Sequence, residues 1–269
     1  MAGASLAGVA GLAGSRVTGA GAATAGGQVA PAASNLSLTS GSSQLVADFA
    51  WARQRALDWV QTGKKAGNIA CYWAGLTTRP AFYSRDFAHQ TVGAHLLGLD
   101  AENLAMLRAF AASATSARRW YPLCSFGFDG SIFRTDYRSD TDFVREIPAV
   151  FELTQKGAEL YRWTGNRAFV DDGTGSIFRG VATYNENHER LIEAGDAIGS
   201  QYQALLGYAT VQAARGDSTG AAATRQRATA QKAHFERSWF STRANRYIRG
   251  FNASGPLTNF GMTTPGSCR

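Results

Sequence analysis

The chain has 269 residues, of which 45% are hydrophobic and 17% charged, with a formal net charge of +7. This composition supports a buried core, in one large domain or two small ones, and excludes a disordered polyelectrolyte. The basic residues form no compact run and accompany no nucleic-acid motif or phosphate-binding loop, so we expect a solvated basic surface and no nucleic-acid partner.

Residues 1–40 differ in composition from the rest of the chain. Residues 2–14 are rich in Ala, Gly and Leu, and small residues continue to Ala33. The stretch is too short and glycine-rich to span a bilayer as a helix, and it is typical of the hydrophobic part of an export signal with a small-residue cleavage region. It also resembles the segment that follows the two arginines of twin-arginine signals. We expect a secreted or periplasmic protein that leaves the membrane after signal removal; a disordered low-complexity tail is the alternative.

Apolar residues at three- and four-residue steps predict the first helices of the folded part, which we expect over residues 41–262, before a short tail at 263–269. The first helix is predicted over 44–61, with an apolar stripe that includes Leu45 and Val60. A second is predicted over about 85–97, ending at Gly98. Asp100 is predicted to cap a third, which carries Leu107 and Phe110.

Residues 120–142 interrupt this helical pattern. Apolar and aromatic residues flank the pair Asp129-Gly130, which readily adopts a type I′ turn. We therefore predict a short β-hairpin inserted between helices.

Helical periodicity returns after this insertion. A long helix is predicted to end at Gly165, with Pro148 in its first turns, where proline is tolerated. Another is predicted over 189–214, and Gly216 and Asp217 are predicted to end it and begin the last one. The alternation of helix, glycine turn, helix and long loop predicts an all-α fold of stacked helix hairpins, with function on the long-loop end.

Two motifs carry a resemblance to a known superfamily. Residues 161–170, YRWTGNRAFV, resemble the Tyr-x-x-Thr-Gly-Asp-x-x-Phe-Leu element of (α/α)6-toroid enzymes, with Asn166 in place of the usual Asp. Residues 83–86, YSRD, look like the aromatic-x-Arg-Asp element that some of these enzymes carry beside the substrate cleft. The resemblance to these six-hairpin glycosidases covers residues 41–260 and implies a carbohydrate substrate. A complete toroid has twelve helices, and only six or seven are predicted here, so it implies an incomplete toroid.

Glycoside hydrolysis requires two carboxyl groups, one on each side of the bond that is cleaved. Glu146 is our leading candidate for the general acid, because an acidic loop over 136–142 would favour its protonated form and only Arg145 opposes this. The alternative is an ordinary carboxylate in the first turn of a helix.

Further candidate site residues lie at two other predicted helix starts. Asp86, Arg85 and Tyr83 form the element that the resemblance places at the cleft, and His89 follows nearly one turn later. A first-turn Asp favoured by the helix dipole and a buried structural His are the alternatives.

The second helix start carries Glu193 and Asp196, which are three residues apart and are predicted to share a helix face. Asp196 is the candidate there, because Gly195 beside it permits close approach of a ligand. A solvated helix start is the alternative.

Four aromatic residues in predicted loops are candidate platforms for sugar rings: Trp73, Trp120, Tyr121 and Tyr137. Core packing is the alternative for each. No cofactor or metal is expected, because the three cysteines form no CxxC pair and have no His at ligand spacing. A Cys71–Cys124 disulfide and buried free thiols both stay open.

The sequence therefore favours a secreted glycoside hydrolase, or an inactive fragment of one, that acts on oligo- or polysaccharide. The alternatives are a helical protein that binds carbohydrate without chemistry, and a polysaccharide lyase that would use Tyr83, Arg85 and His89.

Overall fold

The computed structural model describes residues 36–64, 69–75, 78, 80–133, 137–139, 142–143, 146–171, 175–183, 193–243, 245–248, 250–252 and 255–257. The export-like segment lies outside these residues, apart from residues 36–40. No helix in the described part of the chain is long and apolar enough to cross a membrane.

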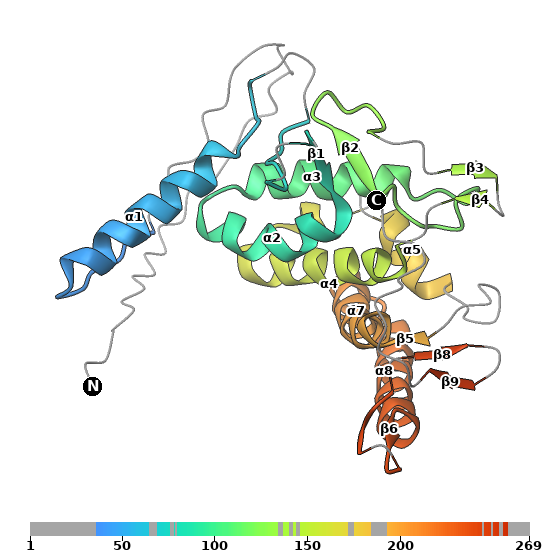
Figure 1. Ribbon diagram of the computed structural model, residues 1–269. Coiled ribbons are helices and arrows are strands. Elements are labelled where there is room, and N and C mark those ends of the chain that lie inside the picture. Colours follow the sequence, from blue (N-terminus) through green and yellow to red (C-terminus); the bar gives the residue numbers. More distant parts are fainter. Residues whose placement is uncertain are drawn as a thin grey trace.

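Most of the described residues are helical, which confirms the all-α prediction (Figure 1). The toroid arrangement stays a prediction. The helices are α1 (Ser43–Asp58), α2 (Ser84–Leu96), α3 (Asp100–Ser113), α4 (Ile147–Thr164), α5 (Gly175–Thr183), α7 (Gly195–Ala214) and α8 (Ser218–Ser238), with the 3₁₀ turn η1 (Arg167–Phe169). The short strands are β1 (Ala81–Tyr83), β2 (Ser125–Gly127), β3 (Tyr137–Ser139), β4 (Asp142–Phe143), β5 (Glu193–Ala194), β6 (Phe240–Ser241), β7 (Arg246–Tyr247), β8 (Gly250–Asn252) and β9 (Gly255–Leu257).

The predicted helix ends are confirmed where glycine adopts a left-handed backbone. Gly98, Gly165 and Gly216 have φ angles of 79°, 67° and 88°, which residues with a Cβ rarely adopt. Asp217 caps α8, because its Oδ1 accepts from the Gly220 N–H at 2.8 Å. The predicted cap at Asp100 is wrong, since Leu99 occupies the N-cap position of α3.

Helix α4 is the centre of the packing, with α2 on one side of it and α7 on the other (Figure 1). Toward α2 and α3, its Leu153 and Leu160 join a large core rich in aromatic rings. Toward α7 and α8, its Val150 and Phe151 join a second core with Leu205. A helix that buries apolar residues on most of its faces lies inside a domain, as α4 does here.

Helix α1 forms as predicted but its apolar stripe is not buried. None of its residues is buried, Leu45 is 46% exposed, and the helix extends away from the others in Figure 1. At the end of the helix Leu57 packs, partly buried, against the core, and just after it Val60 is buried in the core and forms a β-bridge with Tyr72.

The hairpin predicted around Asp129-Gly130 forms only as a short antiparallel turn, in which the Gly127 N–H donates to the Ser131 carbonyl at 2.8 Å. Strand β2 pairs antiparallel with β1, with Phe82 opposite Phe126, and a single bridge links Phe126 to Ile132 across the turn. Of the two turn residues only Gly130 has a positive φ, so the turn is not type I′.

The predicted helix over 189–214 begins only at Gly195, and Glu193 lies in β5, which pairs with β8. The shared helix face predicted for Glu193 and Asp196 is therefore wrong. Helix α5 was not predicted, because it is short and contains two glycines.

Candidate functional site

Four of the residues proposed from the sequence line one polar pocket. Arg85, Asp86 and His89 come from the first turns of α2, and Glu146 is the N-cap residue of α4. Gln90 completes the wall of this pocket, whose volume is about 360 Å³. Two carboxylates, a guanidinium and an imidazole thus line a common space.

Strand pairing sets the position of Arg85 and Asp86. Strand β1 runs directly into α2, and Tyr83 is both its last residue and the N-cap of the helix, with φ −115° and ψ 147°. The Ser84 N–H donates to the Cys124 carbonyl at 2.9 Å, next to β2. The Cys124 sulfur lies 3.9 Å from Glu146 Oε2, so the same segment lies beside the start of both helices.

A charged pair joins the pocket to the core of α4. The Arg85 guanidinium donates from Nε to Glu152 Oε2 at 3.1 Å and from Nη2 to Glu152 Oε1 at 3.0 Å. The Glu152 side chain is 10% exposed and that of Arg85 31%. This two-point geometry fixes the plane of the guanidinium as well as its position. His89 Nε2 lies 3.5 Å from the same carboxylate.

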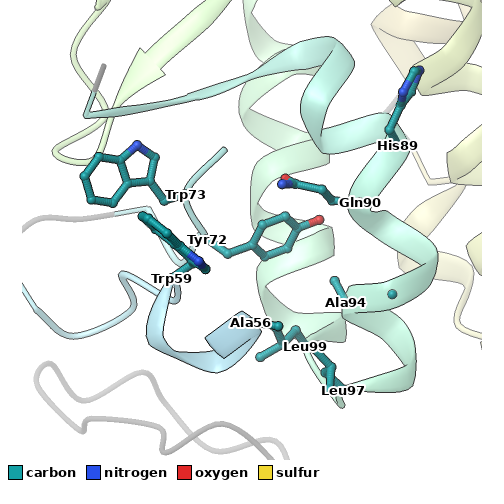
Figure 2. A pocket seen from close by; sticks show the side chains of 10 residues that line it. Ala56, Trp59, Tyr72, Trp73, His89, Gln90, Ala94, Leu97 and Leu99 are labelled. Atoms are coloured by element: carbon teal, nitrogen blue, oxygen red, sulfur yellow. The ribbon is translucent and has the colours of Figure 1, made fainter. Parts of the chain in front are cut away.

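A second, apolar pocket of about 260 Å³ adjoins the polar one, because His89 and Gln90 line both. In Figure 2 the Gln90 side chain points from α2 toward Trp73 and the ring of Tyr72, whereas His89 points away from them. The lining residues are Ala56, Trp59, Tyr72, Trp73, His89, Gln90, Gly93, Ala94, Leu97 and Leu99.

Aromatic contacts hold the wall of this apolar pocket. Trp73 packs edge-to-face against Trp59 and Phe128, with ring centroids 5.0 Å and 5.5 Å away. The Tyr72 hydroxyl donates to Asn103 Oδ1 at 2.8 Å, and burial raises the pKa of this phenol well above its ordinary value. Contacts with neighbouring residues therefore hold the rings of Tyr72 and Trp73 in position.

Cys71, next to Tyr72 in the chain, carries a free thiol, which decides whether Cys71 and Cys124 form a disulfide. Cys71 is buried and unpaired, and burial, with a smaller effect of the Glu102 carboxylate, raises its pKa to about 12. Cys124 is disulfide-bonded whereas Cys71 is free, so a Cys71–Cys124 disulfide does not form.

Three proposed substrate-binding aromatics line neither pocket. Tyr83 is buried, with its ring 6.2 Å from that of Phe133, and Tyr121 is 3% exposed. Trp120 is half-buried beneath the Arg179 guanidinium, which lies 5.3 Å from its ring.

The remaining proposed residues lie wholly or partly outside the described part of the chain. Asp196, Glu193 and Tyr137 belong to α7, β5 and β3, but their side chains lie outside the described part of the structure. Arg145 is not among the described residues.

The sequence interpretation missed Glu152, Gln90, Trp59 and Gly93. Glu152 carried a usable feature, since it is a single carboxylate between Phe151 and Leu153 in an otherwise apolar run. Gln90 and Gly93 lie four and seven residues after Asp86, on one helical face. Trp59 carried no such feature.

Comparisons with other proteins add no assignment: no family model, curated protein or solved structure matches the chain. Among the described residues, no group of three or more His, Cys, Asp and Glu side chains could hold a metal ion.

Proposed function

We propose that this chain belongs to a secreted carbohydrate-processing domain of the α/α-toroid type, and that the polar pocket hydrolyses a glycosidic bond. The observation that carries the proposal is the convergence of Asp86 and Glu146 on one pocket from two different helices. Glycoside hydrolases need two such carboxyl groups, and neutral hydroxylated substrates need the donors and acceptors that Arg85, His89 and Gln90 add around them.

The two carboxylates differ in exposure, which suggests different roles. Glu146 is half-buried at the start of α4, whereas Asp86 is exposed on α2. A general acid benefits from the less hydrated position, because desolvation favours its protonated form. We therefore assign proton donation to Glu146, and activation of water or stabilisation of the developing positive charge to Asp86.

Arg85 has a supporting role in this scheme. Its guanidinium spans both oxygens of Glu152, which fixes one edge of the pocket. A lyase would use such a cation to neutralise the carboxylate of a uronic acid, but Glu152 already neutralises this one. The Arg85–Glu152 pair therefore favours a hydrolase over a lyase.

The experiment compares the purified chain with its Glu146→Gln and Asp86→Asn variants on a panel of neutral and acidic oligosaccharides. We expect new reducing ends with the native chain, and a loss of about 10²–10⁴-fold in kcat for each variant. Glu159→Gln is the matched control, since Glu159 lies on α4 in an ion pair with Lys156 and lines neither pocket.

Other outcomes would replace the proposal. An unsaturated product that absorbs in the ultraviolet would identify a lyase. Saturable binding without product would identify a carbohydrate-binding protein. Activity that survives both substitutions would exclude Asp86 and Glu146 from the chemistry.

A further inference from the structure

We infer that the apolar pocket beside the polar one binds an apolar group of one to two aromatic rings, carried by the same ligand whose hydroxylated part occupies the polar pocket. The inference rests on the proposed function, and it specifies the substrate as a glycoside with an apolar aglycone. The polar pocket would hold the sugar and the apolar pocket the aglycone.

The walls of the apolar pocket favour an apolar occupant. Its surface is formed by indole and phenol rings, by Ala94, Leu97 and Leu99, and by the bare backbone of Gly93. Its polar groups are those of His89 and Gln90, the indole N–H groups of Trp59 and Trp73, and the Tyr72 hydroxyl, which is already bonded to Asn103. A sugar ring placed here would leave most of its hydroxyls without partners, and each such buried group is costly.

The volume of the apolar pocket sets the size of the group. It is about 260 Å³. An engineered cavity of about 150 Å³ in another protein holds a single benzene ring. The present pocket therefore has room for a fused pair of rings or for one substituted ring, and the edge-to-face Trp59–Trp73 pair offers it aromatic faces and edges.

Helix α2 connects the two pockets. Asp86 lines the polar pocket, His89 and Gln90 line both, and Gly93 lines the apolar one. These residues follow the i, i+3, i+4, i+7 spacing of one helical face, and Asp86 and Gly93 are about 10 Å apart along the axis at the rise of an α-helix. That separation matches a sugar ring joined to an aryl group, with the connecting bond near His89 and Gln90.

Gly93 gives a test that does not disturb the fold. A Cβ added there would have no atom within 4 Å, so a larger side chain would extend into the pocket without a clash. Gly93→Leu should fill the pocket while it improves helix propensity. Gly199→Leu is the matched control, because Gly199 is an exposed glycine of α7 with the same open surroundings and lines neither pocket.

The probe is 2-naphthol, whose binding is followed by quenching of tryptophan fluorescence and by calorimetry. We expect binding to the native chain and to Gly199→Leu, and at least tenfold weaker binding to Gly93→Leu. No binding to the native chain, or equal binding to Gly93→Leu, would overturn the inference.

A second comparison separates this inference from the proposed hydrolase. It uses the 2-naphthyl and methyl glycosides of a sugar that the chain hydrolyses. We expect a lower KM for the naphthyl glycoside, and Gly93→Leu should remove the difference. Equal KM values, unaffected by Gly93→Leu, would overturn the inference and leave the hydrolase standing. Binding of 2-naphthol that depends on Gly93, with no glycoside cleaved, would support the apolar site and refute the hydrolase.

Discussion

The same substitution, Gly→Ala, should have opposite effects on stability at Gly93 and Gly180. Both glycines lie within helices, where alanine is favoured over glycine by about 1 kcal/mol. At Gly93 the new methyl group meets nothing within 4 Å. At Gly180 it would lie 2.4 Å from Val150 Cγ2 and 3.0 Å from the Trp120 carbonyl oxygen.

The clash at Gly180 exceeds what the neighbours can relieve easily. Carbon atoms in contact are separated by about 3.5–4.0 Å, so Val150 would have to move by about 1 Å. Val150 is β-branched and buried, and the Trp120 oxygen belongs to the backbone, so neither gives way freely. Overpacking of this kind costs about 1–3 kcal/mol. We therefore expect Gly180→Ala to lower the free energy of unfolding by about 1–2 kcal/mol, and Gly93→Ala to raise it by about 0.5–1 kcal/mol.

Urea denaturation followed by circular dichroism measures both changes. Gly199→Ala serves as a second open position and should behave like Gly93→Ala. If Gly180→Ala were as stable as Gly93→Ala, the close packing of Gly180 on α5 against Val150 on α4 would be refuted. A loss of stability in Gly93→Ala would refute the open surroundings on which the filling variant of the apolar pocket depends.

Three further predictions concern charged and titrating groups. Arg85→Met should destabilise the fold by about 2–3 kcal/mol, because it leaves the Glu152 carboxylate buried without its partner; adding Glu152→Leu should recover much of this in a double-mutant cycle by urea denaturation. Above pH 9 the unfolded chain releases the Cys71 proton while the folded chain, with a pKa of about 12, retains it. Stability should therefore fall by about 1 kcal/mol between pH 9 and pH 10, and Cys71→Ala should remove most of this fall in pH-dependent denaturation. Arg215→Met should lower stability by about 1–2 kcal/mol, as measured by thermal denaturation, because two donors to the Val170 carbonyl are lost, and Arg215→Lys should recover only part of it.

Sequence reasoning succeeded where a local rule determines the structure. The left-handed backbone at Gly98, Gly165 and Gly216 depends on the residue itself, so the helix ends could be predicted. The grouping of Arg85, Asp86 and His89 follows from helical spacing within two turns of α2.

Sequence reasoning failed where a residue or strand contacts another that is distant in the sequence. The Arg85–Glu152 pair joins residues 67 positions apart, and periodicity marks Glu152 only as an unusual residue in an apolar run. The pairing of β2 with the distant β1, in addition to its bridge across the local turn, was missed for the same reason. For α1, the apolar spacing predicted a helix correctly, but it contains no information about what that helix packs against.

Helix α2 explains why the site lies on a helix face and not only in the long loops where it was expected. Its buried face carries Phe87 and Thr91, and the Thr91 carbonyl accepts from Asn103 Nδ2 of α3 at 3.1 Å. The β1–β2 pairing holds its start, and the Arg85–Glu152 pair ties it to α4. With three neighbouring elements holding one side, the opposite face, from Asp86 to Gly93, can line the two pockets without supporting the core. A site on such a face is positioned before the ligand arrives, which lowers the entropic cost of binding.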